Sequence, residues 1–262
     1  MGLFPLRDSN PIRSISFQYV TVSLIAICVA VFLWQLTQGA QSEKIAFSYG
    51  TIPAVLFGSR SLPPDLAVVP PWATLVTAMF LHGGIMHLFG NMLFLWIFGD
   101  NVEDSMGHVR YLVFYLLCGI LAGLAHAAVD PASQIPAIGA SGAISGVLGA
   151  YLVLHPKARV LVIMLRITMV WLPAWIVLGL WIGFQVLSAT MGGGGGVAWW
   201  AHIGGFVAGA ILVVPFRRRG VPLLDGMGGL APVDDERLER DERRHARSIF
   251  PNTVSRRGPW TR

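Results

Sequence analysis

Charged residues are scarce in this chain. Only 13% of its 262 residues are Asp, Glu, Lys or Arg, whereas 54% are apolar and the mean hydropathy is +0.62. Soluble globular domains carry about 25% charged residues. This composition excludes that class and predicts a polytopic membrane protein.

Cysteine is also scarce. The two cysteines, Cys28 and Cys118, lie inside apolar stretches and lack the spacing of a disulfide framework or a zinc knuckle. We interpret both as packing residues. The formal net charge of +5 comes largely from arginine clusters beside apolar stretches, where basic residues commonly fix membrane topology. A nucleic-acid partner is therefore not expected.

Six stretches approach the roughly 20 residues that cross a bilayer as a helix. The second is long enough to hold an additional segment before its helix, which we expect to begin near Gly84. The first exceeds a signal-peptide core and precedes a poor cleavage site, so we expect it to be retained. An all-α fold with six transmembrane helices is predicted over Tyr19 to Leu36, Trp72 to Phe98, Tyr111 to Val129, Ile138 to Leu154, Ile167 to Leu187 and Val197 to Phe216.

Lysine and arginine predict the orientation of these helices. With the amino terminus in the cytoplasm, only Lys44 and Arg60 among the loop residues lie outside, and basic residues prefer the cytoplasmic side. Both termini are then cytoplasmic. The inside set is Arg7, Arg13, Arg110, Lys157, Arg159, Arg166, Arg217, Arg218 and Arg219.

The same pattern divides the chain into three parts. We expect a short cytoplasmic segment at residues 1–16, a six-span core at 17–216 and a charged tail at 217–262. The tail has too few apolar residues to bury a core and is predicted to be disordered.

Two loops between the spans have unusual compositions. The apolar loop from Gly39 to Pro71 is expected at the membrane interface. The run Gly192 to Gly196 is either a mobile cap or a plain linker.

A serine and a histidine stand within the apolar stretches. Ser141 lies in a Gly-Ala-Ser-Gly sequence and His202 follows Trp-Trp-Ala. An ionisable side chain at bilayer depth costs about 2.5–3.5 kcal/mol, which favours a functional role. A serine hydroxyl becomes a good nucleophile when a base such as histidine takes its proton. The pair predicts hydrolysis within a membrane, although Ser141 alone also fits helix packing and His202 alone also fits a hydrogen-bonded core histidine.

Glycines favour close approach of the two helices that carry this pair. Gly142, Gly146 and Gly149 thin one side of the fourth span, and Gly205 and Gly209 form a GxxxG pair on the sixth. Such contact would bring Ser141 and His202 within hydrogen-bond reach.

Acyl transfer also needs hydrogen-bond donors for the developing oxyanion. His87 and Asn91 are four residues apart and therefore share one face of the second span. Together with the Ser141 backbone N–H they could form an oxyanion hole; a structural interhelical hydrogen bond is the alternative. His82 lies nearer the outer surface and is expected to hold a loop in place.

Three blocks resemble the signatures of rhomboid intramembrane serine proteases. They are His82 to Asn91, Gly139 to Gly142 and His202 to Gly209, and the resemblance extends over about residues 15 to 216. It implies a rhomboid-like bundle of six helices.

The resemblance also implies site roles. Ser141 would be the nucleophile and His202 the general base, with His87, Asn91 and the Ser141 amide holding the oxyanion. Structural support would come from His82, Gly139, Gly142, Gly205, Gly209 and, in a cytoplasmic turn, Glu103. No metal and no other cofactor is implied.

Two features depart from the family pattern. Several rhomboids carry a tyrosine four residues after the nucleophile, which stacks on the histidine, whereas this chain has Ser145. The outer-loop Trp-Arg pair of some relatives is also missing. Orientation of His202 must therefore come from another residue.

The expected partners are the lipid bilayer and transmembrane protein substrates. A helix hides its peptide bonds in backbone hydrogen bonds, so substrates should carry helix-weakening residues near the cut. The resemblance adds cleavage near the outer face, after a small residue. The compact six-span core suggests a bacterial plasma membrane.

Three other interpretations remain. An inactive rhomboid-like protein could bind membrane clients. A transporter or channel would need charged groups at midmembrane, which these spans largely lack. A zinc site formed by His82, His87 and His202 resembles no usual metal motif.

Overall fold

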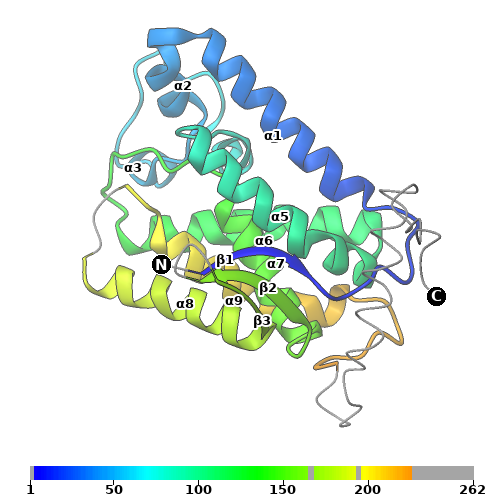
Figure 1. Cartoon of the computed structure of the whole chain (residues 1–262). Coiled ribbons are helices and arrows are strands. Elements are labelled where there is room, and N and C mark those ends of the chain that lie inside the picture. Colours follow the sequence, from blue (N-terminus) through cyan, green and yellow to red (C-terminus); the bar gives the residue numbers. More distant parts are fainter. Residues whose placement is uncertain (1–2, 165–167, 193–195, 226–262) are drawn as a thin grey trace, which may run out of the picture. The chain divides into compact units, whose positions relative to one another are not determined.

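The computed structural model describes residues 3–164, 168–192 and 196–225, and helices dominate this part of the chain (Figure 1). The longer helices are α1 (Tyr19–Thr37), α5 (Ile85–Met106), α6 (His108–Val129), α7 (Ser141–Leu154), α8 (Ala174–Thr190) and α9 (Trp199–Phe216). Short helical segments between α1 and α5 are η1 (Gly39–Gln41), α2 (Ser42–Tyr49), α3 (Pro53–Leu56), η2 (Pro71–Ala73), α4 (Thr74–Thr77) and η3 (Ala78–Phe80).

Three of these helices, α1, α6 and α9, are long and apolar enough to cross a membrane. A fourth span results if the segment Pro71–Phe80 and α5 are counted as one broken helix. The two parts meet at a bend of 83°. The helix predicted to start near Gly84 begins at Ile85, which confirms that boundary. Helices α7 and α8 are apolar but shorter, with 14 and 17 residues.

A three-stranded antiparallel sheet shows that the all-α prediction is wrong. Its strands are β1 (Leu3–Asp8), β2 (Arg159–Met164) and β3 (Thr168–Pro173), in the order β1-β2-β3. The apolar residues of β2 and β3 fit a buried strand as well as a helix, and periodicity does not separate the two. The predicted fifth helix, from Ile167, therefore starts only at Ala174. Pro173 ends the strand there, and proline is tolerated at the start of a helix.

The sheet connects α5 to α8. Strand β1 contacts α5, whereas β2 and β3 contact α8. The Phe4 ring stacks on Phe89 of α5 with centroids 6.3 Å apart. The Tyr151 hydroxyl of α7 donates a hydrogen bond to Asp8 Oδ2. The amino-terminal segment is thus packed onto the helices.

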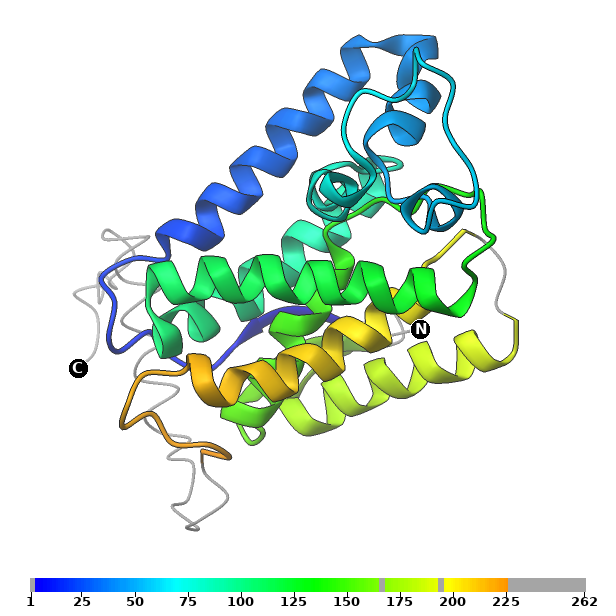
Figure 2. The same cartoon turned by 180° about the vertical axis from the view of Figure 1, so that it is seen from behind.

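Helix α7 is the centre of the helical packing. It contacts α9, α6 and α5, and all but three of its 14 residues are buried. Figures 1 and 2 show α9 running beside α6 and α8. At the α7–α9 contact, a Cβ on Gly205 would lie 2.0 Å from the Gly142 carbonyl oxygen, and one on Gly209 would lie 1.9 Å from the Gly146 carbonyl oxygen. These glycines let the two backbones touch.

Two carboxylates at the end of α5 hold the start of α1. Glu103, which is fully buried, accepts hydrogen bonds from the backbone N–H groups of Val20 and Thr21 at 2.9 and 2.8 Å. Asp104 accepts three more from the backbone N–H groups of residues 13, 14 and 15. Glu103 therefore caps α1 from another helix, as N-cap side chains do locally.

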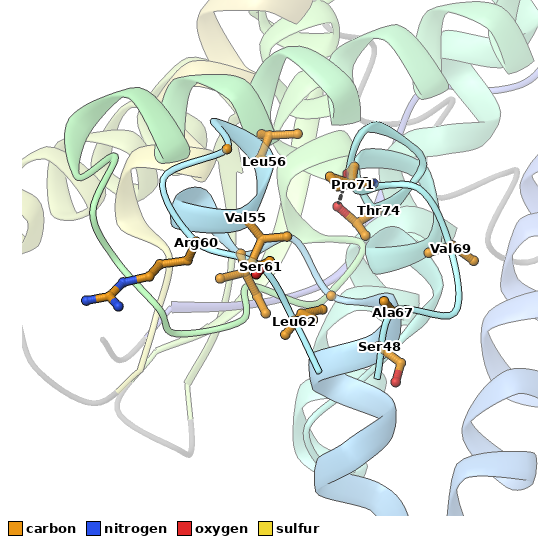
Figure 3. Close-up of a pocket in the computed structure, with 13 residues that line it drawn as sticks. Ser48, Val55, Leu56, Arg60, Ser61, Leu62, Ala67, Val69, Pro71 and Thr74 are labelled. Carbon is orange, nitrogen blue, oxygen red and sulfur yellow. Dashed lines mark hydrogen bonds between the residues drawn. The ribbon is translucent and has the colours of Figure 1, made fainter. Parts of the chain in front are cut away.

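The segment between α1 and α5 forms its own cavity, of about 380 Å³ (Figure 3). Val55, Leu62 and Val69 are among the residues that line it, and the Arg60 side chain extends away from the others. The loop from Gly39 to Pro71, predicted to lie at the membrane interface, thus turns part of its apolar side chains into this cavity.

The predicted charged tail lies mostly outside the described residues, as do residues 193–195 of the glycine run. The first part of the tail packs back onto α7. The backbone N–H groups of Leu224 and Asp225 donate to the carbonyl oxygens of Val153 and Leu154.

A valine at Gly209 should separate α7 from α9. Its Cβ would overlap the Gly146 carbonyl oxygen, a backbone atom that cannot move aside. We expect the free energy of unfolding to fall by about 3 kcal/mol, the upper range for overpacking, measured by thermal unfolding in detergent. The control is Gly183→Ala on α8, where a Cβ meets no atom within 4 Å of the described structure. Equal unfolding temperatures for the two variants would contradict the close contact.

Stability should depend on pH through Asp8. Burial raises the pKa of this carboxyl to about 7, although the Tyr151 hydrogen bond opposes the shift. An unfolded aspartate titrates near about 3.9, so the folded state binds the proton more tightly and loses stability as the pH rises from about 4 to 7.

The comparison is between the wild type and Asp8→Asn, which keeps a neutral acceptor for Tyr151. We expect the unfolding temperature of the wild type to fall relative to the variant as the pH rises from about 4 to about 7. Asp100 is electrostatically coupled to Asp8, so the difference between the two proteins reports this pair, whereas titrating groups remote from Asp8 cancel. Parallel pH profiles would show that Asp8 is not the titrating group.

Candidate active site

Ser141 is the first residue of α7, and the backbone before it is tightly fixed. Gly139 has a φ of +124°, in a region that favours glycine. Its N–H donates to the Ala78 carbonyl oxygen at 2.8 Å. A Cβ at this position would lie 2.7 Å from His87 Cε1. Only glycine fits here, so the serine loop lies directly against α5.

His202 reaches this serine from the first turn of α9. Its Nε2 lies 2.8 Å from Ser141 Oγ, which is hydrogen-bond distance. The glycine contact between α7 and α9 brings the two side chains together, since each stands at the beginning of its helix.

A glutamine that sequence reasoning missed contacts the other side of the histidine ring. Gln185 of α8 places Oε1 2.8 Å from His202 Nδ1, and its Nε2 donates to the Trp181 carbonyl oxygen at 3.3 Å. The available signal was a polar residue inside an apolar stretch, the same criterion that selected Ser141 and His202.

Tryptophan rings flank the histidine. The Trp181 and Trp199 rings lie 6.0 and 6.2 Å from the His202 ring between centroids. Ser145, which stands where several rhomboids carry tyrosine, is fully buried and donates to the Ser141 carbonyl oxygen at 2.6 Å. The aromatic neighbours of His202 therefore come from α8 and α9.

His87 and Asn91 face the serine from α5. The Gly83 N–H donates to His87 Nδ1 at 3.3 Å, which leaves Nε2 as the donor of that ring. Asn91 is 8% exposed, and its Nδ2 has no hydrogen-bond partner among the described residues. Two side-chain donors are thus free to bind an acceptor near Ser141.

One cavity, of about 940 Å³, joins these groups. Its walls come from α5, α7, α8 and the residues that lead into α9. Gly196 of the glycine run also lines it. The polar side chains on its walls are His87, Asn91, Ser141, Gln185 and His202.

The remaining predicted site residues are not among those that line this cavity. His82 is 2% exposed, and its ring lies 5.2 Å from that of His87. Gln35 of α1 binds both the N–H and the carbonyl oxygen of His82. Gly142, Gly205 and Gly209 lie at helix contacts. Within the described ranges, no three His, Cys, Asp or Glu side chains are grouped as metal ligands would be.

Comparison with known proteins gives a family match. The model of a family described as "Rhomboid domain" matches residues 70–219. The "Rhomboid protease GluP" of Bacillus subtilis is 37% identical over 201 residues, covering 76% of this chain and 35% of that protein. The "RHOMBOID-like protein 5" of Arabidopsis thaliana is 31% identical over 146 residues, 53% of this chain and 42% of the relative. This chain therefore aligns with well under half the length of either relative.

Proposed function

The chain is an integral membrane protein of the rhomboid family, and we propose that it is an intramembrane serine endopeptidase. The observation that carries this proposal is the 2.8 Å contact between Ser141 Oγ and His202 Nε2 inside a cavity with free hydrogen-bond donors. A serine paired with a base is the arrangement that nucleophilic catalysis requires.

In the proposed reaction, Ser141 Oγ attacks the carbonyl carbon of a peptide bond while its proton passes to His202 Nε2. His202 then gives this proton to the leaving nitrogen as the carbon–nitrogen bond breaks, and Ser141 holds the acyl group. A water molecule next attacks the acyl carbon and transfers a proton to His202. This proton returns to Ser141 Oγ when the acid product leaves.

The oxyanion of each tetrahedral intermediate would bind three donors. Asn91 Nδ2 and His87 Nε2 are the side-chain donors, and the Ser141 N–H is the third. This N–H belongs to the first turn of α7, where backbone donors have no partner within the helix. Donors already in position stabilise the oxyanion without reorganisation.

A six-span topology with both termini in the cytoplasm belongs to the same proposal. Helices α7 and α8 would join α1, α6, α9 and the broken helix formed by Pro71–Phe80 and α5. With 14 residues, α7 is about 21 Å long, less than the roughly 30 Å hydrocarbon core. Ser141 would then lie below the outer membrane face, with the cavity as the route for water.

The core at 17–216 would act on transmembrane proteins whose helices unwind easily near the cut, because only an unwound segment exposes its carbonyl groups. We place this activity in a bacterial plasma membrane; the Bacillus subtilis relative is bacterial. The short segment 1–16 and the charged tail 217–262 would lie on the cytoplasmic side.

A serine-hydrolase probe tests the proposal without a known substrate. The purified wild type in detergent should be labelled by a fluorophosphonate, and Ser141→Ala and His202→Ala should each lose at least about 99% of the labelling because nucleophile and base act as a unit. Ser188→Ala is the control, since this serine of α8 lies outside the cavity walls. A folded wild type that resists labelling would favour the client-binding interpretation.

Oxyanion donors should affect turnover more than binding. With a model transmembrane substrate in liposomes, Asn91→Ala is expected to lower kcat about 100-fold with a small change in KM, as loss of one oxyanion donor does elsewhere. Met92→Ala, on the same helix and outside the cavity walls, controls for changes in α5. A rise in KM at unchanged kcat would assign Asn91 to substrate binding.

A further inference from the structure

We propose that Gln185 is a positioning residue that fixes His202 in the tautomer whose Nε2 accepts the serine proton. This inference rests on the proposed function and adds a third side chain to the site. The three side chains come from three helices: Ser141 from α7, His202 from α9 and Gln185 from α8.

The contacts of the Gln185 amide determine which of its ends faces the histidine. Its Nε2 donates to the Trp181 carbonyl oxygen at 3.3 Å, four residues earlier on the same helix. A carbonyl oxygen only accepts hydrogen bonds, so the amide nitrogen must point there. Gln185 Oε1 is left 2.8 Å from His202 Nδ1.

The histidine tautomer follows from this orientation. Because Oε1 cannot donate, the hydrogen of the neutral ring must be on Nδ1. Nε2 then carries the lone pair and faces the Ser141 hydroxyl at 2.8 Å. In the opposite tautomer, the lone pairs of Gln185 Oε1 and His202 Nδ1 would face each other. His202 Nε2 would already hold a proton and could not accept one from Ser141.

Burial keeps the glutamine in place. Gln185 is 4% exposed and lies among the apolar residues of α8. Trp181 contributes both its carbonyl oxygen to the amide and its ring to the face of His202. A rotated Gln185 side chain would leave buried polar groups without partners, which costs free energy.

A neutral amide suits this depth better than a carboxylate. In serine proteases with a triad, an aspartate holds the histidine tautomer and stabilises the imidazolium. An ionised carboxylate inside a membrane is expensive. Gln185 supplies the acceptor without the charge. The Nδ1 hydrogen stays in place throughout, and only Nε2 gains and loses a proton.

A purely structural hydrogen bond between α8 and α9 is the competing explanation. It predicts that Gln185 variants lose stability in proportion to activity, whatever side chain replaces the glutamine. A positioning role predicts that activity follows the presence of an acceptor at Nδ1.

The experiment compares Gln185→Met and Gln185→Glu with the wild type. Gln185→Met keeps the size but removes the acceptor, and should lower kcat about 10- to 100-fold at nearly constant KM, the range seen when a metal-bound histidine loses the partner that orients it. Gln185→Glu restores an acceptor oxygen and should recover kcat to within about tenfold of the wild type. Thr190→Val is the control, because Thr190 on the same helix is exposed and binds only carbonyls of α8.

A second measurement reads the tautomer directly. The protein is labelled with ¹⁵N-histidine, and the His202 resonances are assigned by their loss in His202→Ala. The wild type should show a protonated Nδ1 and an unprotonated Nε2, and Gln185→Met should show a mixture. Gln35→Met should keep the wild-type pattern, since Gln35 is an equally buried glutamine that binds only the His82 backbone.

The outcomes separate the two proposals. If the wild type is inactive but His202 carries its hydrogen on Nδ1, the proteolytic function is refuted. The contact between Gln185 and His202 is then still supported. An active wild type whose Gln185→Met variant keeps both kcat and the tautomer would refute the role of Gln185. Equal loss in the Met and Glu variants, with an unchanged His202 pattern, would show a structural bond only.

Discussion

Direct contact between the α7 and α9 backbones is the constraint on which the site depends. Lipid tails are as apolar as the helix surfaces, so the hydrophobic effect does not drive helices together in a bilayer, and close packing must do so. Gly205 and Gly209 place no side chain against the carbonyl oxygens of Gly142 and Gly146, which a Cβ would approach to 2.0 and 1.9 Å. The separation of Ser141 from His202 is therefore set by backbone against backbone, which is stiffer than a contact between side chains.

The sequence singles out the candidate site residues because each is an anomaly. Ser141, His202, His87 and Asn91 are polar side chains in apolar surroundings, and the structure places all four on one cavity. Gln185 is the same kind of anomaly, but a lone amide carries no familiar motif. The role of Gln185 depends on the packing of α8 against α9, which is a tertiary contact.

The sheet was hidden for a different physical reason. Residues 168–173 fall inside the predicted fifth span, whereas residues 159–164 lie outside every predicted span. Strands β2 and β3 pair as neighbours in sequence, and β2 also pairs with β1, about 150 residues earlier in the chain. Local patterns contain no information on such a partner. The same distance in sequence concealed the role of Asp8, which binds Tyr151 of α7. Glu103 was predicted as a structural acid only through family resemblance, and its hydrogen bonds to α1 supply the physical explanation.

The three strands also form a mechanical link between α5 and α8, two helices that line the cavity. Strand β1 lies on α5, strands β2 and β3 lie on α8, and ladder hydrogen bonds join them. Hydrogen bonds between strands resist shear along the strands because many must break together, whereas bonds peeled from one end break in succession. If α5 and α8 move apart as rigid bodies, β1 must either travel with α8 or unzip from β2. The separation of these two helices is thus tied to β1, residues Leu3–Asp8.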